Sequence, residues 1–514
     1  MKIKHLINSI IILVISFTSS CLKDKGNYDY KQINEIVISG IEKSQRYEVF
    51  SFVDTLRIAP NLEGIDNHNS DRFTYEWKIM PRLGDDTKDS IDRVVSRHRN
   101  LEFPVVLEEG NYIGYFTVTD HNQGTTWGES FLILVRTLTS EGFMVLSEEN
   151  GHGRMDMISN LSEDEYVVAY NVWQEEGYNL GKPKALHFNY NLVLPSSSIY
   201  VSESGSYLLD KNLMLSEASN FGWTFGSARE KVFVKETNST SFSSRELVIT
   251  EEGELFARKT FTIGSVFEFP INYINGVDKF IPSPIIGMPI PNNDAGYWPY
   301  DHSILLYDDT NKQFLELSEK NEFPTMIHFN NPNLFPIKTG RDILHASSTL
   351  NRQTFAVLKE PRDSKVYIYG MTLGPDGVNT QNYYLQAVGP EIEYAKEFAF
   401  HPILPYMFYS TENRVYQFDY SQPEIPAKIA LEYLDSEVAS LNFFPIVGWN
   451  AYNQWERDKA LLLVVGRNKT EVMEEPGIVE FYTIPSLSRP LEKKVQLEDF
   501  GKIIDIKLRE RNAN

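Results

Sequence analysis

Cysteine is almost absent from this sequence of 514 residues, in which Cys21 is the only one. A chain with a single thiol forms no internal disulfide, so its stability must come from packing and hydrogen bonds. Long hydrophobic runs are also lacking, because the apolar run from Leu6 to Phe17 is shorter than the roughly 20 residues that a membrane-spanning helix needs. Positive charge is scarce as well, with 49 Lys and Arg against 70 Asp and Glu. An acidic surface repels phosphates, so we expect no nucleic-acid partner.

The local motifs of common catalytic and metal sites are missing too. None of the 10 histidines has the spacing of a helical zinc site, and there are no cysteine ligands to complete one. The sequence has no Gly-x-Ser-x-Gly nucleophile elbow and no Gly-rich phosphate loop. Acidic turns such as 308–311 lack the full ligand ladder of a calcium loop. We therefore predict no cofactor, no metal and no catalytic residue, although an enzyme built from residues far apart in the sequence stays open.

The first twenty residues are organised like a bacterial signal peptide. Lys2 and Lys4 precede the apolar run, and the small residues 18–20 precede Cys21. We expect cleavage before Cys21 and acylation of its thiol, which anchors the mature chain in a membrane. The alternative is a buried unpaired cysteine, and the position directly after small residues argues against it. The relaxed motif before the cysteine resembles lipoproteins of the Bacteroidetes, and the charged tract 22–25 resembles their surface-export signals. This resemblance implies lipid anchoring in the outer membrane with exposure at the cell surface.

Roughly 490 residues follow the predicted signal peptide, more than the about 250–300 that one hydrophobic core organises. Aromatic residues make up 13% of the chain. Strand-type alternation is frequent, whereas long amphipathic helical windows are scarce. We predict a mainly β protein with a lipidated tether over residues 21–32, a β-sandwich over 33–137 and a second domain over 138–510.

Short alternating segments separated by turns are typical of the predicted sandwich. They include residues 35–39, 55–59, 73–77, 113–119 and 131–135. The sequence Tyr75-Glu76-Trp77 and the segment 109–120 are similar to the core-tryptophan strand and the hairpin of PKD-type immunoglobulin-like domains. The opening from Cys21 to Gly40 resembles that of PKD-like family lipoproteins of Bacteroides and relatives. The resemblance implies an immunoglobulin-like spacer or adhesion module without catalytic residues.

Residues 138–510 contain a recurring unit of an apolar strand, a polar turn and a second alternating strand. The turns of these hairpins centre near positions 150, 204, 252, 310, 362, 412 and 470. A period of about 50 residues is close to that of four-stranded propeller blades. We predict a β-propeller with seven blades, whose ring the strand 502–508 closes against the first blade. A generic large β domain with fewer blades is the alternative.

Tryptophan and tyrosine residues lie between the predicted hairpins, in the connections that form the two faces of a propeller. The candidates for ligand contact are Trp173, Trp223, Trp298, Tyr300, Trp449 and Trp455. Exposed aromatic rings beside Asn and Asp suit stacking on sugars or contact with apolar side chains of a peptide. The same residues could instead wedge between blades as core, and the sequence does not separate these interpretations.

No feature of the residues demands an enzyme, and we expect a non-catalytic surface lipoprotein in which the sandwich lifts a binding or docking propeller off the membrane. The resemblance to PKD-like lipoproteins implies an accessory role beside a SusC/SusD-like transporter complex, with capture of a glycan or peptide ligand for nutrient uptake. The rival is a propeller hydrolase or lyase acting on surface oligosaccharides or peptides. Convergent carboxylates with a histidine in a deep axial pocket would favour the enzyme, and a flat aromatic face would favour binding.

Overall fold

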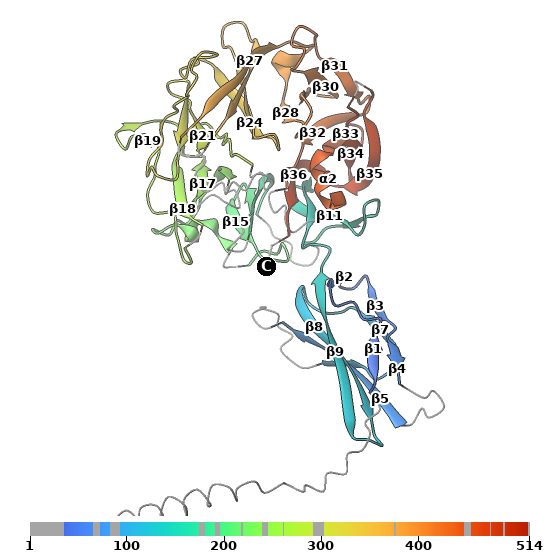
Figure 1. The fold of residues 1–514 in the computed structure, drawn as a ribbon. Helices are drawn as coiled ribbons and strands as arrows, with labels where there is room; N and C mark the ends of the chain where they lie inside the picture. Colours follow the sequence, from blue (N-terminus) through green and yellow to red (C-terminus); the bar gives the residue numbers. More distant parts are fainter. Residues whose placement is uncertain are drawn as a thin grey trace, which may run out of the picture. The chain divides into compact units, whose positions relative to one another are not determined.

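The computed structural model describes residues 35–511 apart from 65–71, 83–92, 174–179, 191–195, 217–218, 239–244, 261, 291–302, 375–376, 447–453, 473 and 487–488. The predicted signal peptide, the predicted tether and Cys21 lie outside the described residues. The chain divides into two compact units, residues 1–135 and 136–514, in which strands predominate (Figure 1). The predicted domain bounds, 33–137 for the sandwich and 138–510 for the propeller, stay predictions. None of the described helices is long and apolar enough to cross a membrane.

Unit 1 is a β-sandwich. One sheet has the strand order β2-β9-β8-β5-β6, and two smaller pairs, β1-β4 and β3-β7, share a single hydrophobic core with it. The strands are β1 (Val37–Ser39), β2 (Tyr47–Phe50), β3 (Thr55–Ile58), β4 (Asn61–Glu63), β5 (Phe73–Pro81), β6 (Arg93–Ser96), β7 (Leu101–Pro104), β8 (Gly110–Asp120) and β9 (Thr125–Arg136). Each segment that alternation predicted as a strand overlaps one of these strands.

Trp77 lies at the centre of the sandwich core and is fully buried. Its indole N–H donates to the backbone oxygen of His98 at 2.9 Å, so the one polar atom of the ring is paired. The ring of Phe116 on β8 lies 4.3 Å from the Trp77 ring, measured between centroids. β8 alternates between buried and half-buried residues along its whole length, as expected of a strand with one face in the core. The immunoglobulin-like sandwich is therefore confirmed.

Unit 2 is a β-propeller, and its described residues form seven sheets in a ring and one small separate pair, β19 (Tyr273–Ile274) and β20 (Asp278–Lys279) (Figure 1). Consecutive strands pair antiparallel within each blade. The blades are β36 (Lys502–Arg509), β10 (Gly142–Glu149), β11 (His152–Asn160) and β12 (Tyr166–Ala169); β13 (Pro183–Asn189), β14 (Ser197–Ser202) and β15 (Gly205–Leu209); β16 (Val234–Asn238), β17 (Arg245–Thr250) and β18 (Leu255–Lys259); β21 (Ile304–Asp308), β22 (Gln313–Leu317) and β23 (Thr325–Met326); β24 (Asp342–Ser348), β25 (Thr354–Lys359), β26 (Val366–Thr372) and β27 (Thr380–Ala387); β28 (Glu397–Phe400), β29 (Tyr406–Ser410), β30 (Arg414–Asp419) and β31 (Lys428–Glu432); β32 (Ser436–Asn442), β33 (Leu463–Lys469), β34 (Gly477–Thr483) and β35 (Glu492–Phe500). We number them blades 1 to 7 in this order.

Both faces of each blade are buried, which explains the continuous apolar runs in the sequence. On β10, Phe143 and Val145 belong to a core shared with blade 7, whereas Met144 and Leu146 belong to a core shared with blade 2. Corresponding cores join every following pair of blades. Hydrophobic packing thus runs around the whole ring, and the prediction of seven blades is confirmed.

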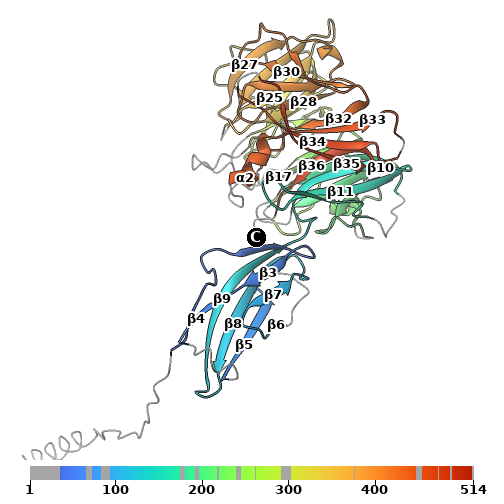
Figure 2. The same cartoon turned by 90° about the vertical axis from the view of Figure 1, so that its right-hand side faces the viewer.

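The ring is closed by β36, the last strand of the chain. It pairs antiparallel with β10, so that Ile506 lies opposite Val145 and Leu508 opposite Phe143. The red end of the chain therefore lies beside the teal first blade in Figure 1, and Figure 2 shows the red and teal strands in the same part of the propeller. Closure of the ring by the segment 502–508 is confirmed.

Blade 4 departs from the repeat at its inner edge. The segment 282–287 lies on the inner side of β21, where the other blades have a regular inner strand. Only two isolated bridges join it to β21, between Pro282 and Asp308 and between Gly287 and Leu305. Proline lacks the N–H that a ladder needs, and Pro282 and Pro284 both lie in this segment. The sequence pattern located the hairpin β21–β22 of this blade but gave no sign of its irregular inner segment.

Candidate functional site

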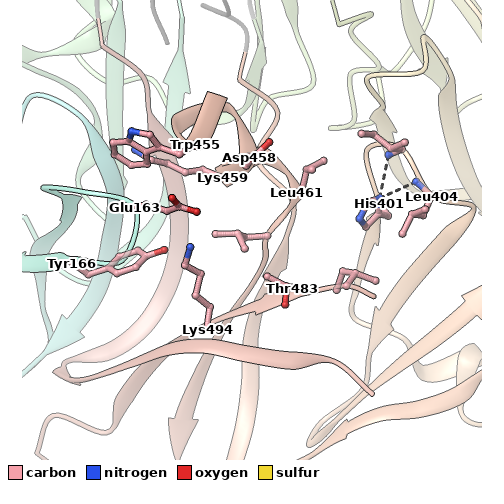
Figure 3. Close-up of a pocket in the computed structure, with 13 residues that line it drawn as sticks. Glu163, Tyr166, His401, Leu404, Trp455, Asp458, Lys459, Leu461, Thr483 and Lys494 are labelled. Carbon is pink, nitrogen blue, oxygen red and sulfur yellow. Dashed lines mark hydrogen bonds between the residues drawn. The ribbon is translucent and has the colours of Figure 1, made fainter. Parts of the chain in front are cut away.

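Three neighbouring blades border a cavity of about 460 Å³ at one end of the propeller (Figure 3). Within a blade, the connections between the first and second and between the third and fourth strands lie at the same end, because antiparallel strands alternate in direction. The lining comes from such connections of blades 6, 7 and 1. The longest of them joins β32 to β33 and contains α2 (Gln454–Asp458) and the 3-10 turn η8 (Lys459–Leu461). We call this cavity the terminal cleft.

One side of the terminal cleft is apolar. Ile403, with 49% of its surface exposed, and Leu404 come from the turn between β28 and β29. His401 holds this turn, since its Nδ1 accepts the backbone N–H groups of Ile403 at 3.1 Å and of Leu404 at 2.9 Å. Burial lowers the pKa of His401 to about 4, so the ring is neutral at physiological pH. With its acceptor nitrogen committed to the backbone, His401 supports the cleft wall and is unsuited to act as a general base there.

The opposite side carries charges of both signs and two aromatic rings. Figure 3 shows Glu163, Tyr166 and Lys494 together there, with Trp455 of α2 at the rim beside Lys459. The Lys459 ammonium lies 5.1 Å from the Trp455 ring centroid, within the range of a cation–π contact. Aromatic faces next to hydrogen-bonding groups can stack on a sugar ring or hold a peptide side chain.

A buried ionic network fixes the position of α2 and η8. Glu141 forms salt bridges with Lys459 at 3.3 Å and with Arg511 at 2.7 Å, and Arg136 lies 3.4 Å away. Desolvation raises the pKa of Glu141, but the three cations more than offset this effect and hold the pKa below its usual value. Glu456 of α2 pairs with Arg511 and Arg136. The helix that carries Trp455 is thus tied to residues that lie just before β10 and just after β36.

The structure separates the six predicted ligand-contact residues. Trp455 lines the terminal cleft. Trp223 is 55% exposed on η3 (Phe221–Thr224), away from the residues that line this cleft. Trp173 is only 5% exposed and packs between blades 1 and 2, where its N–H donates to the backbone oxygen of Leu213 at 2.7 Å. For Trp173 this position corresponds to the core interpretation, because little of its ring can reach a ligand. Trp298, Tyr300 and Trp449 lie outside the described residues.

A second group of functional side chains lies around the propeller axis. Inner strands of neighbouring blades contact one another there, including β36 with β13 and β24 with β28. Asp505 and Lys507 of β36 form a salt bridge of 3.1 Å, and His187 of β13 lies 3.8 Å from Glu236 of β16. Glu236 and Lys507 keep 33% and 32% of their side-chain surfaces accessible although inner strands surround them. We call the accessible space between the inner strands the axial channel.

The protonation of these axial groups is unusual. Burial raises the pKa of Glu236 to about 7, against the lowering effects of Lys507 and of the Thr237 backbone N–H. Burial and then the charge of Asp505 raise the pKa of Glu397 on β28 to about 7 as well. Burial and Lys507 lower the pKa of His187 to about 4. At neutral pH, the channel therefore contains two partly ionised carboxyl groups and a neutral imidazole.

Sequence reasoning found Trp455 and none of the axial residues. Glu163, His401 and Lys494 come from three blades and lie in ordinary turns and strands, so no local spacing connects them. The axial residues occupy inner strands, where charged residues in otherwise strand-like segments were the only available signal. In the described part of the chain, no group of three or more His, Cys, Asp or Glu residues could hold a metal ion.

One protein family and several solved structures are similar to this chain. Residues 21–183 match the PKD-like family, a range that spans the sandwich and the first blade of the propeller. No curated protein sequence matches the chain. A quinonprotein alcohol dehydrogenase-like protein from Bacteroides thetaiotaomicron is similar in structure, with 11% identity, a TM-score of 0.40 and coverage of 90% of this chain and 96% of that one.

Two further solved structures are similar over the propeller. The Dos1 propeller has 10% identity and a TM-score of 0.40, and the match covers 70% of this chain and 86% of that one. Sqt1 from Saccharomyces cerevisiae has 10% identity and a TM-score of 0.36, with coverage of 70% and 90%. Likeness at this level transfers no activity, because many functions occur on one fold.

Proposed function

We propose that this protein is a non-catalytic lipoprotein on the outer surface of the outer membrane, which captures a glycan or peptide as an accessory of a SusC/SusD-like uptake system. The signal-peptide pattern and the resemblance of residues 21–40 to surface lipoproteins support the location. The match of residues 21–183 to the PKD-like family supports a chain built as a spacer followed by a working domain.

The observation that carries the binding function is the composition of the terminal cleft. Its volume of about 460 Å³ lies in the range of sites for small ligands. Trp455 offers an aromatic face, Ile403 and Leu404 offer an aliphatic wall, and Glu163 and Lys494 offer hydrogen bonds and charge. No described lining residue pairs a nucleophile with a free base, so the cleft is suited to holding a ligand and not to transforming it.

Binding at the terminal cleft can be tested on glycan and peptide arrays with the purified full-length protein. We expect Trp455→Ala to bind the ligand that the arrays identify at least tenfold more weakly. The substitution removes both the stacking contact with the indole ring and the apolar surface that the ligand would bury. Trp223→Ala is the matched control, since it removes an exposed tryptophan elsewhere on the propeller and should bind like the wild type. Equal binding by both variants and the wild type would place the ligand outside this cleft.

The rival function, a hydrolase or lyase, is favoured by one observation. The axial channel brings Glu236, Glu397 and His187 together from three blades, and carboxyl groups with pKa values near 7 are suited to general acid–base catalysis. Incubation with fluorogenic oligosaccharides and peptides tests this alternative. Turnover that Glu236→Gln and Glu397→Gln each abolish would establish it, whereas ligand release in unchanged form supports the binding function.

A further inference from the structure

A second cavity, which the proposed function does not use, lies among the inner strands of the propeller. This axial cavity has a volume of about 210 Å³. Its walls are mostly apolar and include Met288, Phe398, Phe400 and Phe443. The lining comes from inner strands β16, β24, β28 and β32 and from the irregular inner segment of blade 4, so the cavity lies on the axis and not between two blades.

Two polar atoms in this wall lack partners within the described structure. His345 Nε2 and Ser347 Oγ, both on β24, are buried and accept no hydrogen bond from protein groups. Burial lowers the pKa of His345 to about 4, so its ring is neutral and one nitrogen can act as an acceptor. Buried polar groups normally have partners, and a hydrogen-bond donor in the cavity would supply them.

The carboxyl groups of Glu236 and Glu397 lie deeper along the axis than this cavity. Asn238 and Ala399 line the cavity, and Glu236 and Glu397 precede them by two residues on the same faces of β16 and β28. Two residues of a strand span about 7 Å, so each carboxylate lies one pleat below the cavity wall. Among the described residues, neither glutamate forms a salt bridge with lysine or arginine, while Lys507 is paired with Asp505.

We propose that the axial cavity and channel bind an alkylammonium group, with its alkyl stem against the apolar walls and its ammonium head toward Glu236 and Glu397. An ammonium carries three donors and no acceptor, which suits carboxylate partners, and the neutral His345 ring and the Ser347 hydroxyl can each also accept a hydrogen bond. It also adds positive charge to a channel in which three carboxyl groups, Glu236, Glu397 and Asp505, share the one ammonium of Lys507. The source of the group is either a free diamine or a lysine side chain of a peptide, because both present the same head and stem.

Protonation of the site follows from its neighbours. Glu236 and Glu397 both interact with Asp505 and Lys507 of β36, and His187 of β13 lies beside Glu236; His187 and His345 are neutral. A bound cation favours the ionised carboxylates, so binding releases protons near neutral pH. Affinity therefore increases with pH until both carboxyl groups are ionised.

Isothermal titration calorimetry of the full-length protein tests the proposal with two probes, cadaverine and Nα-acetyl-lysine-N′-methylamide. We expect at least one probe to bind saturably at pH 8, and we expect its affinity to be at least tenfold weaker at pH 5.5. E236Q/E397Q should reduce affinity at least tenfold at pH 8. The matched control is E63Q/E102Q, which removes two exposed carboxylates from unit 1 and should bind like the wild type. Binding of cadaverine alone identifies a free amine as the source, and equal or tighter binding of the lysine derivative identifies a peptide side chain.

Three results would overturn the proposal. The first is no heat of binding from either probe at millimolar concentration with wild-type protein whose thermal unfolding shows it to be folded. The second is unchanged affinity in E236Q/E397Q. The third is equally tight binding of 1,5-pentanediol, which has the same stem without the charge and would show an apolar cavity with no cation site. The terminal cleft is not involved in any of these measurements, so failure here leaves the proposed function standing.

Discussion

At the scale of single residues, the buried carboxyl groups of this propeller have two opposite kinds of surroundings. Glu141 is buried among Arg136, Lys459 and Arg511, whereas Glu236 and Glu397 share only Lys507, which forms its salt bridge with Asp505. The first arrangement stabilises the fold when the carboxylate is ionised. The second destabilises it under the same condition, which is the usual property of a site kept for a ligand.

The axial glutamates should make stability depend on pH in a specific direction. Their pKa values of about 7 exceed the ordinary 4.5, so the folded state binds these protons more tightly than the unfolded state. Their contribution to stability is complete below pH 4.5 and is lost as the pH rises through about 7. Glutamine cannot ionise, so we expect the unfolding free energy of E236Q/E397Q to exceed that of the wild type by about 1–2 kcal/mol at pH 8. This value already includes a reduction for screening by solvent in the channel. Near pH 4.5 the two proteins should be equally stable. Urea unfolding at both pH values measures this difference, and a gap that grows toward low pH would contradict it.

Glu141 should behave in the opposite way. Its pKa lies below the ordinary value because the attraction of three cations exceeds the effect of burial, so it stabilises the fold above pH 4.5 and loses this effect as the pH falls through its folded pKa. We expect Glu141→Gln to cost about 3–5 kcal/mol at pH 7, because it leaves the cations of the network short of a buried carboxylate. Glu251→Gln, at an exposed salt bridge with Lys184, is the control and should change stability by less than about 1 kcal/mol. Thermal unfolding at pH 7 and pH 4 measures this loss of stability. A loss from Glu141→Gln that is larger at pH 4 than at pH 7 would contradict this assignment.

At the scale of elements, the closure of the ring depends on one strand from the end of the chain. β36 supplies Ile503, Ile506 and Leu508 to the core between blades 7 and 1, and it pairs with β10. We expect a chain that ends after Gly501 to lose the cooperative unfolding transition of unit 2, because blade 1 then has an unpaired edge and the ring stays open. A chain that ends after Arg511 retains β36 and is the control. Differential scanning calorimetry compares them, and an unchanged transition after removal of β36 would show that closure is not required.

Patterns within one element were predictable, and arrangements between elements were not. The hairpin near position 150 and the strand 502–508 were visible because apolar residues on both faces of a propeller strand leave a clear local signal. The inner segment of blade 4 was missed because Pro282 and Pro284 interrupt the ladder that alternation reveals. From the sequence, Trp173 and Trp455 were equal candidates for ligand contact. Only packing separates them, since Trp173 meets Tyr200 of the next blade and Trp455 meets Lys459 at a cavity.

At the scale of the whole molecule, we propose a lipid anchor, a spacer and a binding propeller in this order along the sequence. The anchor at Cys21 lies outside the described residues and remains a prediction from the signal-peptide pattern. We expect Cys21→Ser to move the protein from washed membranes to the soluble fraction while its thermal unfolding temperature stays the same, because the acyl chains are lost and the folded units are untouched. Cell fractionation with immunoblotting measures the distribution. Full retention of the variant in washed membranes would show that another attachment holds the protein.

The central claim is that the protein works beside an outer-membrane uptake complex, and its most direct test is affinity purification from detergent-solubilised outer membranes. The full-length protein carries a tag after Asn514, and quantitative mass spectrometry compares its partners with those of an untagged strain. The account predicts that a SusC/SusD-like pair co-purifies in amounts comparable to the tagged protein. Recovery of the tagged protein without any transporter subunit above the untagged background would contradict it.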